Sequence, residues 1–125
     1  MEVSEMTISE LQDECFLSAR GAGWWDNTPG DFAVPIKVAL IHSELTEVLE
    51  ADRRRGADGG FAASDKIPEF SALEEEIADV IIRSLDLAGF LRLDVEGAIQ
   101  AKLRYNETRH DHKKEVREAS GGKRY

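Results

Sequence analysis

The sequence has few of the features that indicate a secreted, zinc-binding or membrane protein. Its one cysteine, Cys15, cannot form an internal disulfide framework and has no metal-ligand spacing around it. The most apolar stretch, residues 77–93, is interrupted by charged side chains, and the acidic residues 1–14 lack the apolar run of a signal peptide. We therefore expect a cytoplasmic protein without a membrane partner.

Positive charge is also in deficit. The chain has 25 Asp and Glu residues against 16 Lys and Arg residues, which gives a formal net charge of −9. Nucleic-acid backbones and anionic lipids would be repelled, so both are excluded as main partners. A polyphosphate is compatible with this charge if divalent cations lie between the two.

What the sequence does contain is helical periodicity. With 125 residues and 42% hydrophobic residues, the chain is long enough for one domain with a real core. No strand-like alternation of useful length occurs. We predict a single all-α domain over residues 1–114, a four-helix antiparallel bundle completed by oligomerisation, followed by a charged, frayed tail over residues 115–125.

Capping residues and apolar spacing set the helix boundaries. Thr7 with Glu10, and Ser71 with Glu74, match the capping box that begins a helix, and Gly56 suits a C-terminal cap. The predicted helices run from Thr7 or Ser9 to Gly21, from Ala33 or Pro35 to Arg55, from Ser71 to Leu91, and from Asp94 to His110 or beyond.

The second predicted helix carries two acidic residues on the apolar face that we expect to be buried. Its apolar stripe is formed by Val38, Ile41, Leu45 and Val48, and this is the face that we expect to be buried. Glu44 and Glu47 lie on that face or at its edge. Burial of an ionised carboxylate is costly unless the group is paired or binds a metal.

The third predicted helix repeats this anomaly. It is apolar around most of its circumference, which predicts a central position, yet it carries Glu76 and Asp79, and Arg83 and Asp86 continue the same stripe. In an antiparallel bundle the two pairs would bring four carboxylates together. Such ligands suit Mg²⁺ or Mn²⁺, and the absence of histidine from these positions argues against zinc. Each pair alone could be an ordinary surface charge, but two pairs on apolar faces favour a site.

The fourth predicted helix offers basic and polar groups. Lys102, Asn106 and Arg109 share one face, a spacing suited to holding phosphate oxygens beside a carboxylate–metal cluster. The alternative is a solvated basic face.

These motifs, in this order, resemble the all-α nucleoside triphosphate pyrophosphohydrolase superfamily, which includes MazG-like proteins, dCTP pyrophosphatases and dimeric dUTPases. The family signature is E-E-x-x-E followed after a spacer by E-x-x-D. The matching segments are Ser43-Glu44-Leu45-Thr46-Glu47, Glu76-Ile77-Ala78-Asp79, and K-x-x-x-N-x-x-R from Lys102 to Arg109. The resemblance covers roughly Pro35 to Lys113.

The resemblance implies an enzyme of nucleotide metabolism and its site residues. Glu44, Glu47, Glu76 and Asp79 would bind Mg²⁺, with Mn²⁺ as a substitute, and Glu47 would act as general base. Water would attack the α-phosphorus of an NTP or dNTP, giving the monophosphate and pyrophosphate. Lys102, Asn106 and Arg109 would contact the phosphates or the sugar. A house-cleaning role and a homodimer or dimer of dimers are also implied.

Some positions depart from the pattern or allow two interpretations. Ser43 replaces the first Glu of the signature, which bears on the number of metals, and Glu50 is a candidate replacement. Arg83 is either a phosphate clamp or a counter-ion to Asp79 and Asp86.

Trp25 is a candidate for stacking on the base, and Lys37 for reaching the same cavity. The alternatives are that Trp24 and Trp25 pack as a lid or in a subunit interface, and that Lys37 is solvated.

Two other functions compete with this hypothesis. One is a non-catalytic helical interaction module of the same fold, which would have no reason to keep four carboxylates on buried faces. The other is a superfamily hydrolase acting on phosphoribosyl-ATP or an alarmone.

Overall fold

The computed structural model is all-helical, as predicted, and describes residues 2–109, 114–119 and 121–122. The chain divides into two compact units, Met1–Leu93 and Asp94–Tyr125, which are described separately. Among the described residues, extended pairing is limited to the isolated bridges Arg55–Phe61 and Ala63–Ser71. The prediction of a single domain over residues 1–114 stays a prediction.

The first unit contains three α-helices and two short 3₁₀ turns. The turns are η1 (Val3–Glu5) and η2 (Gly30–Phe32), and the helices are α1 (Ile8–Gly21), α2 (Ala33–Arg53) and α3 (Ala72–Phe90). Both predicted capping boxes form: Thr7 and Glu10 cap α1, and Ser71 and Glu74 cap α3. The side-chain and backbone groups of each pair bond reciprocally, which explains why these starts were predictable.

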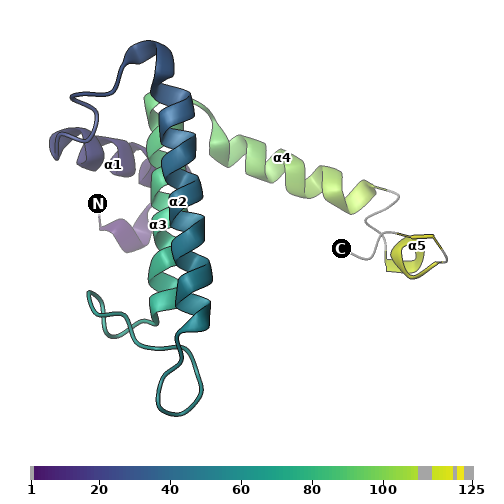
Figure 1. Ribbon diagram of the computed structural model, residues 1–125. Helices are drawn as coiled ribbons and strands as arrows, with labels where there is room; N and C mark the ends of the chain where they lie inside the picture. Colours follow the sequence, from purple (N-terminus) through teal and green to yellow (C-terminus); the bar gives the residue numbers. More distant parts are fainter. Residues whose placement is uncertain (1, 110–113, 120, 123–125) are drawn as a thin grey trace. The chain divides into compact units, whose positions relative to one another are not determined.

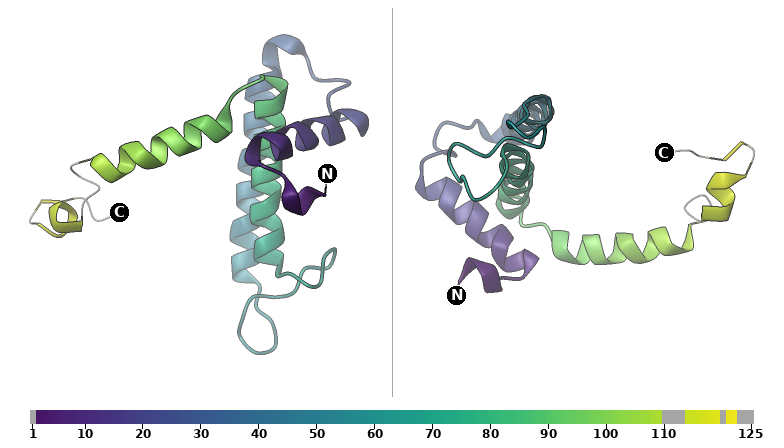
Figure 2. Two further views of the ribbon diagram at one scale, coloured as in Figure 1. Left: turned by 180° about the vertical axis from the view of Figure 1, so that it is seen from behind. Right: turned by 90° about the horizontal axis from the view of Figure 1, so that it is seen from below.

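α3 is the central helix of this unit, as its apolar circumference predicted. It lies antiparallel beside α2 along most of its length, and α1 packs across its other side (Figures 1 and 2). At this crossing a Cβ added to Gly89 would lie 2.7 Å from the Phe16 Cβ and 3.2 Å from the Gln12 carbonyl oxygen. Only a glycine therefore allows α1 to approach α3 this closely.

The end of α2 differs from the prediction. The helix stops at Arg53 instead of Arg55, because Arg54 is extended and Arg55 pairs with Phe61, stacking its guanidinium 4.7 Å from the Phe61 ring centre. Gly56 is therefore not the helix cap. Its amide instead donates to the Gly60 carbonyl within the following turn, where Gly59 takes a positive φ of 84°.

The buried stripe of α2 also differs from the prediction. The buried residues of α2 are Ala33, Lys37 and Ala51, and the half-buried Glu44 lies on the same face of the helix. Of the predicted stripe, Val38 and Leu45 are 38% and 48% exposed in a single chain, whereas Ile41 and Val48 are half-buried. Glu44 thus lies within the packed face and not beside it, which places its carboxylate against α3.

The second unit contains the remaining helices. α4 (Val95–Thr108) begins at Asp94, whose side chain accepts from the Gly97 amide as predicted. α4 ends at Thr108, earlier than the predicted His110, which lies outside the described residues. Within the predicted frayed tail, α5 (Lys114–Glu118) forms a short helix. Within the described ranges, every helix is too short or too polar to cross a membrane.

Candidate functional site

Three of the four predicted carboxylates come together on the α2–α3 pair. Glu44 of α2 and Glu76 and Asp79 of α3 each offer a carboxylate oxygen, and these oxygens all lie within 4.8 Å of one another. All three side chains are partly buried. We call this group the acidic cluster. The i, i+3 spacing on α3 and the antiparallel packing of α2 produce this convergence.

The electrostatics of the acidic cluster disfavour its charged form. Burial raises the pKa of Asp79, and repulsion from Glu44 and Glu75 adds to the rise, while Lys66 opposes it. Burial also raises the pKa of Glu76, with contributions from Asp79, Glu75, Glu44 and Glu47. A divalent cation bound among these like charges would offset their repulsion.

Glu47, the predicted general base, lies at the edge of this arrangement. It is exposed on α2 and, among the described residues, is not part of the acidic cluster, although its charge contributes to the raised pKa of Glu76. Its assignment stays a prediction. Glu50, the candidate replacement for the missing first Glu, is exposed and paired with Arg53 at 2.6 Å. Ser43 is exposed and donates to the Leu40 carbonyl of its own helix.

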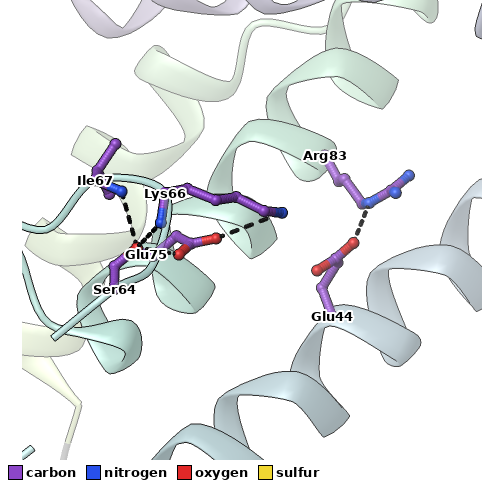
Figure 3. Close-up of polar contacts among 6 residues, drawn as sticks. All are labelled: Glu44, Ser64, Lys66, Ile67, Glu75 and Arg83. Carbon is purple, nitrogen blue, oxygen red and sulfur yellow. Dashed lines mark hydrogen bonds and ion pairs between the residues drawn. The ribbon is translucent and has the colours of Figure 1, made fainter. Parts of the chain in front are cut away.

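Arg83 pairs with Glu44 and not with the carboxylates expected from its own helix. Its Nε donates to Glu44 Oε1 at 2.7 Å, with 28% of the Arg83 side chain and 16% of the Glu44 side chain exposed (Figure 3). The guanidinium also lies 5.5 Å from the Trp24 ring centre. Arg83 therefore connects α3 to α2 and leaves part of its fork open to the cavity, to which it contributes.

The segment between α2 and α3 adds residues that sequence analysis missed. Ser64 is 2% exposed, and its Oγ donates to the Glu75 carboxylate while accepting from the Lys66 and Ile67 amides (Figure 3). This arrangement directs Lys66 back along α3, with its Nζ 3.9 Å from Glu75 Oε2. Lys66 lines the same cavity as Glu44 and Asp79.

A cavity of about 540 Å³ opens on the acidic cluster. This volume is typical of a small-molecule site. Its wall is contributed by α1, the segment after it, α2, the Lys66 loop and α3. The lining residues are Leu11, Glu14, Cys15, Ser18, Ala19, Ala22, Trp24, Lys37, Glu44, Lys66, Asp79, Ile82, Arg83 and Asp86.

The predicted substrate contacts Lys37 and Trp25 occupy a buried network beside this cavity. Lys37 is 6% exposed, so the solvated alternative is wrong; its Nζ donates to the Trp24 carbonyl at 3.1 Å. Trp25 stacks on Phe90 with ring centres 4.0 Å apart, and Lys37 Nζ lies 4.2 Å from the Trp25 ring centre. These contacts fit the packing alternative for Trp25, whereas Trp24 is 58% exposed and lines the cavity.

The three α4 residues belong to the second unit. Lys102 Nζ lies 4.6 Å from the Tyr105 ring centre, and Asn106 Oδ1 is buried without a hydrogen-bond partner in the described part of the chain. Arg109 is the C-terminal cap residue of α4. Their substrate-binding role, and with it the docking of α4 as the fourth member of the bundle, stays a prediction.

The fold and the cavity define an all-α protein with an acidic, nucleotide-sized site. Comparison with curated proteins finds a relative, the dATP/dGTP diphosphohydrolase of Cyanophage S-2L, that is 37% identical over 87 residues, covering 61% of this chain and 79% of the relative. At this identity and coverage, the chain belongs to the family of this diphosphohydrolase. No protein-family model matches the chain. No solved structure matches it either.

Proposed function

We propose that this protein is a Mg²⁺-dependent pyrophosphohydrolase of the MazG-like superfamily, which converts a nucleoside triphosphate to the monophosphate and pyrophosphate. The observation that carries the proposal is the acidic cluster opening on a nucleotide-sized cavity. Membership of a diphosphohydrolase family supports the same reaction class. House-cleaning of the nucleotide pool is the matching biological role.

The donor set of the acidic cluster fits a hard divalent cation. It consists of carboxylate oxygens alone, and burial, with repulsion between neighbouring carboxylates, raises the pKa values of Glu76 and Asp79, an effect that a bound cation would oppose. Glu44, Glu76 and Asp79 would hold Mg²⁺, with Mn²⁺ as a substitute, and Glu47 would complete the set. The cation would supply charge neutralisation for the phosphates and acidify a nearby water.

The protein's own groups would then orient the phosphates and receive a proton. Lys66 and Arg83 both bring positive charge to the cavity, Lys66 beside Glu75 and Arg83 beside Glu44 (Figure 3). Both are suited to phosphate oxygens, Lys66 as a mobile point charge and Arg83 as a fork fixed by Glu44. Glu47, exposed beside Glu76, would accept the proton of the attacking water. Lys102, Asn106 and Arg109 of α4 would add further phosphate or sugar contacts.

Deoxypurine triphosphates are the substrates we propose to test first. The phage relative is named for its action on dATP and dGTP. In this chain the cavity combines an exposed Trp24 ring with apolar side chains such as Leu11 and Ile82, which suit a base.

We also propose that the protein works as a homodimer or a dimer of dimers. The support is an apolar surface left open on α2 and α3, which would be covered by a second copy. Its members are each 38–50% exposed: Val38, Leu45 and Leu49 of α2, and Ile77 and Ile81 of α3. Exposed apolar side chains gathered on two paired helices are typical of an interface with another chain.

The test is pyrophosphate release from the four dNTPs and four NTPs, with Mg²⁺, with Mn²⁺ and with EDTA. We expect metal-dependent release, greatest for dATP or dGTP, and its loss in EDTA with recovery on readdition of Mg²⁺. Asp79→Asn should reduce kcat by at least about a hundredfold, because it removes a charge at the centre of the cluster.

The control is Glu69→Gln, which makes the same charge change on the exposed part of the loop and should keep full activity. Release that persists after chelation, or an Asp79→Asn enzyme with normal turnover, would contradict the metal assignment. A protein that releases pyrophosphate from none of the eight nucleotides would contradict the proposed substrate class, and would favour the interaction module or another phosphate anhydride.

A further inference from the structure

The proposed function gives no role to Asp86, a buried carboxylate at the cavity. Asp86 is 8% exposed, lies in the central helix α3 and lines the cavity. A carboxylate buried to this extent is costly unless it is held by hydrogen bonds or is kept for a ligand.

One oxygen of Asp86 is fixed and the other is left for the cavity. Oδ1 accepts from Trp25 Nε1 at 2.9 Å, and the Trp25 ring is itself held between Phe90 and Lys37. In the part of the chain that the structure describes, no hydrogen bond to Oδ2 is found. The carboxylate is therefore aligned by a rigid ring and retains an acceptor for something else.

The position of Asp86 separates it from the phosphate end. It lies seven residues after Asp79 on α3, about 10 Å along the helix at 1.5 Å per residue. Lys37 lies equally far from Glu44 on the antiparallel α2, so both helices lead from the acidic cluster to the Lys37–Asp86 level of the same cavity. This spacing is comparable to the span from the α-phosphorus to the base of an extended mononucleotide.

The chemistry at this level suits a base and not a phosphate. A carboxylate repels phosphate oxygens and accepts hydrogen bonds from N–H groups, as Asp and Glu do from the cytosine amino group in nucleic-acid complexes. Apolar side chains line the same cavity, among them Leu11 and Ile82, and Trp24 presents a ring.

We propose that Asp86 is the specificity-determining residue of the site, an inference that rests on the proposed function. Its carboxylate accepts a hydrogen bond from the exocyclic amino group of the nucleobase. Trp25 is the positioning residue that holds this carboxylate. Adenine and guanine both carry such a group, at different ring positions. Asp86 would favour amino-bearing bases over analogues that lack the amino group.

The experiment uses the full-length protein and pairs of nucleotides that differ by one amino group. dGTP is compared with dITP, which lacks the 2-amino group, and dATP with the triphosphate of deoxynebularine, which lacks the 6-amino group. In the wild-type protein we expect removal of the amino group to lower kcat/KM at least about tenfold for one pair, because the lost bond involves a charged acceptor. Binding of dGMP and dIMP, measured by calorimetry without metal, should show the same order.

Asp86→Asn is the informative variant. It keeps a carbonyl oxygen for Trp25 Nε1 but presents an amide donor to the cavity, so the tenfold preference should fall to about one. Glu14→Gln is the matched control, because it removes the same charge from another residue lining the cavity and should preserve the preference. Trp25→Phe keeps an aromatic ring but releases Oδ1, and should weaken the preference partly.

The outcomes separate this inference from the proposed function. A wild-type protein that hydrolyses both members of each pair equally overturns the role of Asp86 while leaving the reaction class intact. A preference for the amino-bearing base that survives Asp86→Asn also overturns the role of Asp86. If Asp86→Asn instead loses discrimination against 2′,3′-dideoxy nucleotides, Asp86 contacts the sugar and the inference is again overturned. If no triphosphate is hydrolysed, the monophosphate titrations still decide whether Asp86 recognises the amino group.

Discussion

Asp79 illustrates how a single side chain can oppose folding while serving a site. Burial and the neighbouring Glu44 and Glu75 raise its pKa in the folded state above its unfolded value. The folded protein therefore binds more protons than the unfolded chain between those two values, and stability falls as the pH rises through this window. At neutral pH, without metal, the charge on Asp79 is a net cost.

We therefore predict that Asp79→Asn raises the melting temperature of the metal-free protein by a few degrees at neutral pH. The gain should vanish at a pH well below the unfolded pKa of aspartate, where the wild-type carboxyl is protonated too. Calorimetry in EDTA at both pH values measures this. Added Mg²⁺ should stabilise the wild-type protein and not the variant. A variant less stable than wild type at neutral pH would show that Asp79 has a stabilising partner.

The members of the acidic cluster were predictable from the sequence where their spacing along one helix brings them together. Glu76 and Asp79 share a face because they lie one turn apart, and Glu44 joins them because α2 and α3 pack antiparallel. Ser64 and Lys66 were not predictable, because their positions depend on the path of an irregular segment. The burial of Lys37 depends on the Trp24 carbonyl, a contact between distant residues that no local pattern indicates.

At the scale of elements, the loop over residues 54–71 is the part that depends most on one side chain. Ser64 Oγ bonds Glu75 and two loop amides at a position that is almost fully buried. Ser64→Ala would remove the hydrogen-bond partner of the two loop amides and leave Glu75 with its ion pair to Lys66, and a buried group left unsatisfied costs roughly 1–3 kcal/mol. We predict a loss of stability in that range in urea unfolding, faster proteolysis within the loop, and a higher KM, because Lys66 is no longer directed to the cavity.

Ser84→Ala provides the comparison. Ser84 is exposed and donates only to the Val80 carbonyl of its own helix, so its removal should change stability by less than about 0.5 kcal/mol. Equal effects of the two substitutions would mean that Ser64 does not organise the loop.

Element starts were easier to predict than element ends. The capping boxes at Thr7 and Ser71 are complete within four residues of sequence, so local chemistry determines them. The end of α2 is determined instead by the pairing of Arg55 with Phe61 across a turn. A glycine at position 56 looked like a cap, but the chain had already left the helix at Arg54.

At the scale of the whole molecule, the uncovered apolar surface of α2 and α3 leads to a prediction about assembly. Leu45 and Leu49 are 48% and 49% exposed and lie one turn apart. If a second copy covers them, Leu49→Glu places a charge in an apolar interface and should convert dimers to monomers in sedimentation experiments. The helical circular-dichroism signal should persist, because the side chain is not part of the core of a single chain.

Leu17→Glu, at a leucine of α1 that is 58% exposed, is the control and should leave the assembly unchanged. A wild-type protein that sediments as a monomer at all concentrations would refute the prediction. The all-α class was predictable from periodicity alone, and so was the need to bury the stripe through Val38 and Leu45, but which chain would cover it was not. Hydrophobic spacing shows which face needs a partner, and it does not show whether that partner is the same chain.

The close approach at Gly89 makes the position of α1 depend on a residue outside the cavity lining. Gly89 holds α1 against α3, and α1 carries Cys15 and Ser18 in the cavity wall. A methyl group at position 89 would clash with the Phe16 side chain and push α1 away from α3. The width of the cavity can thus be changed by a substitution at a residue that does not line it.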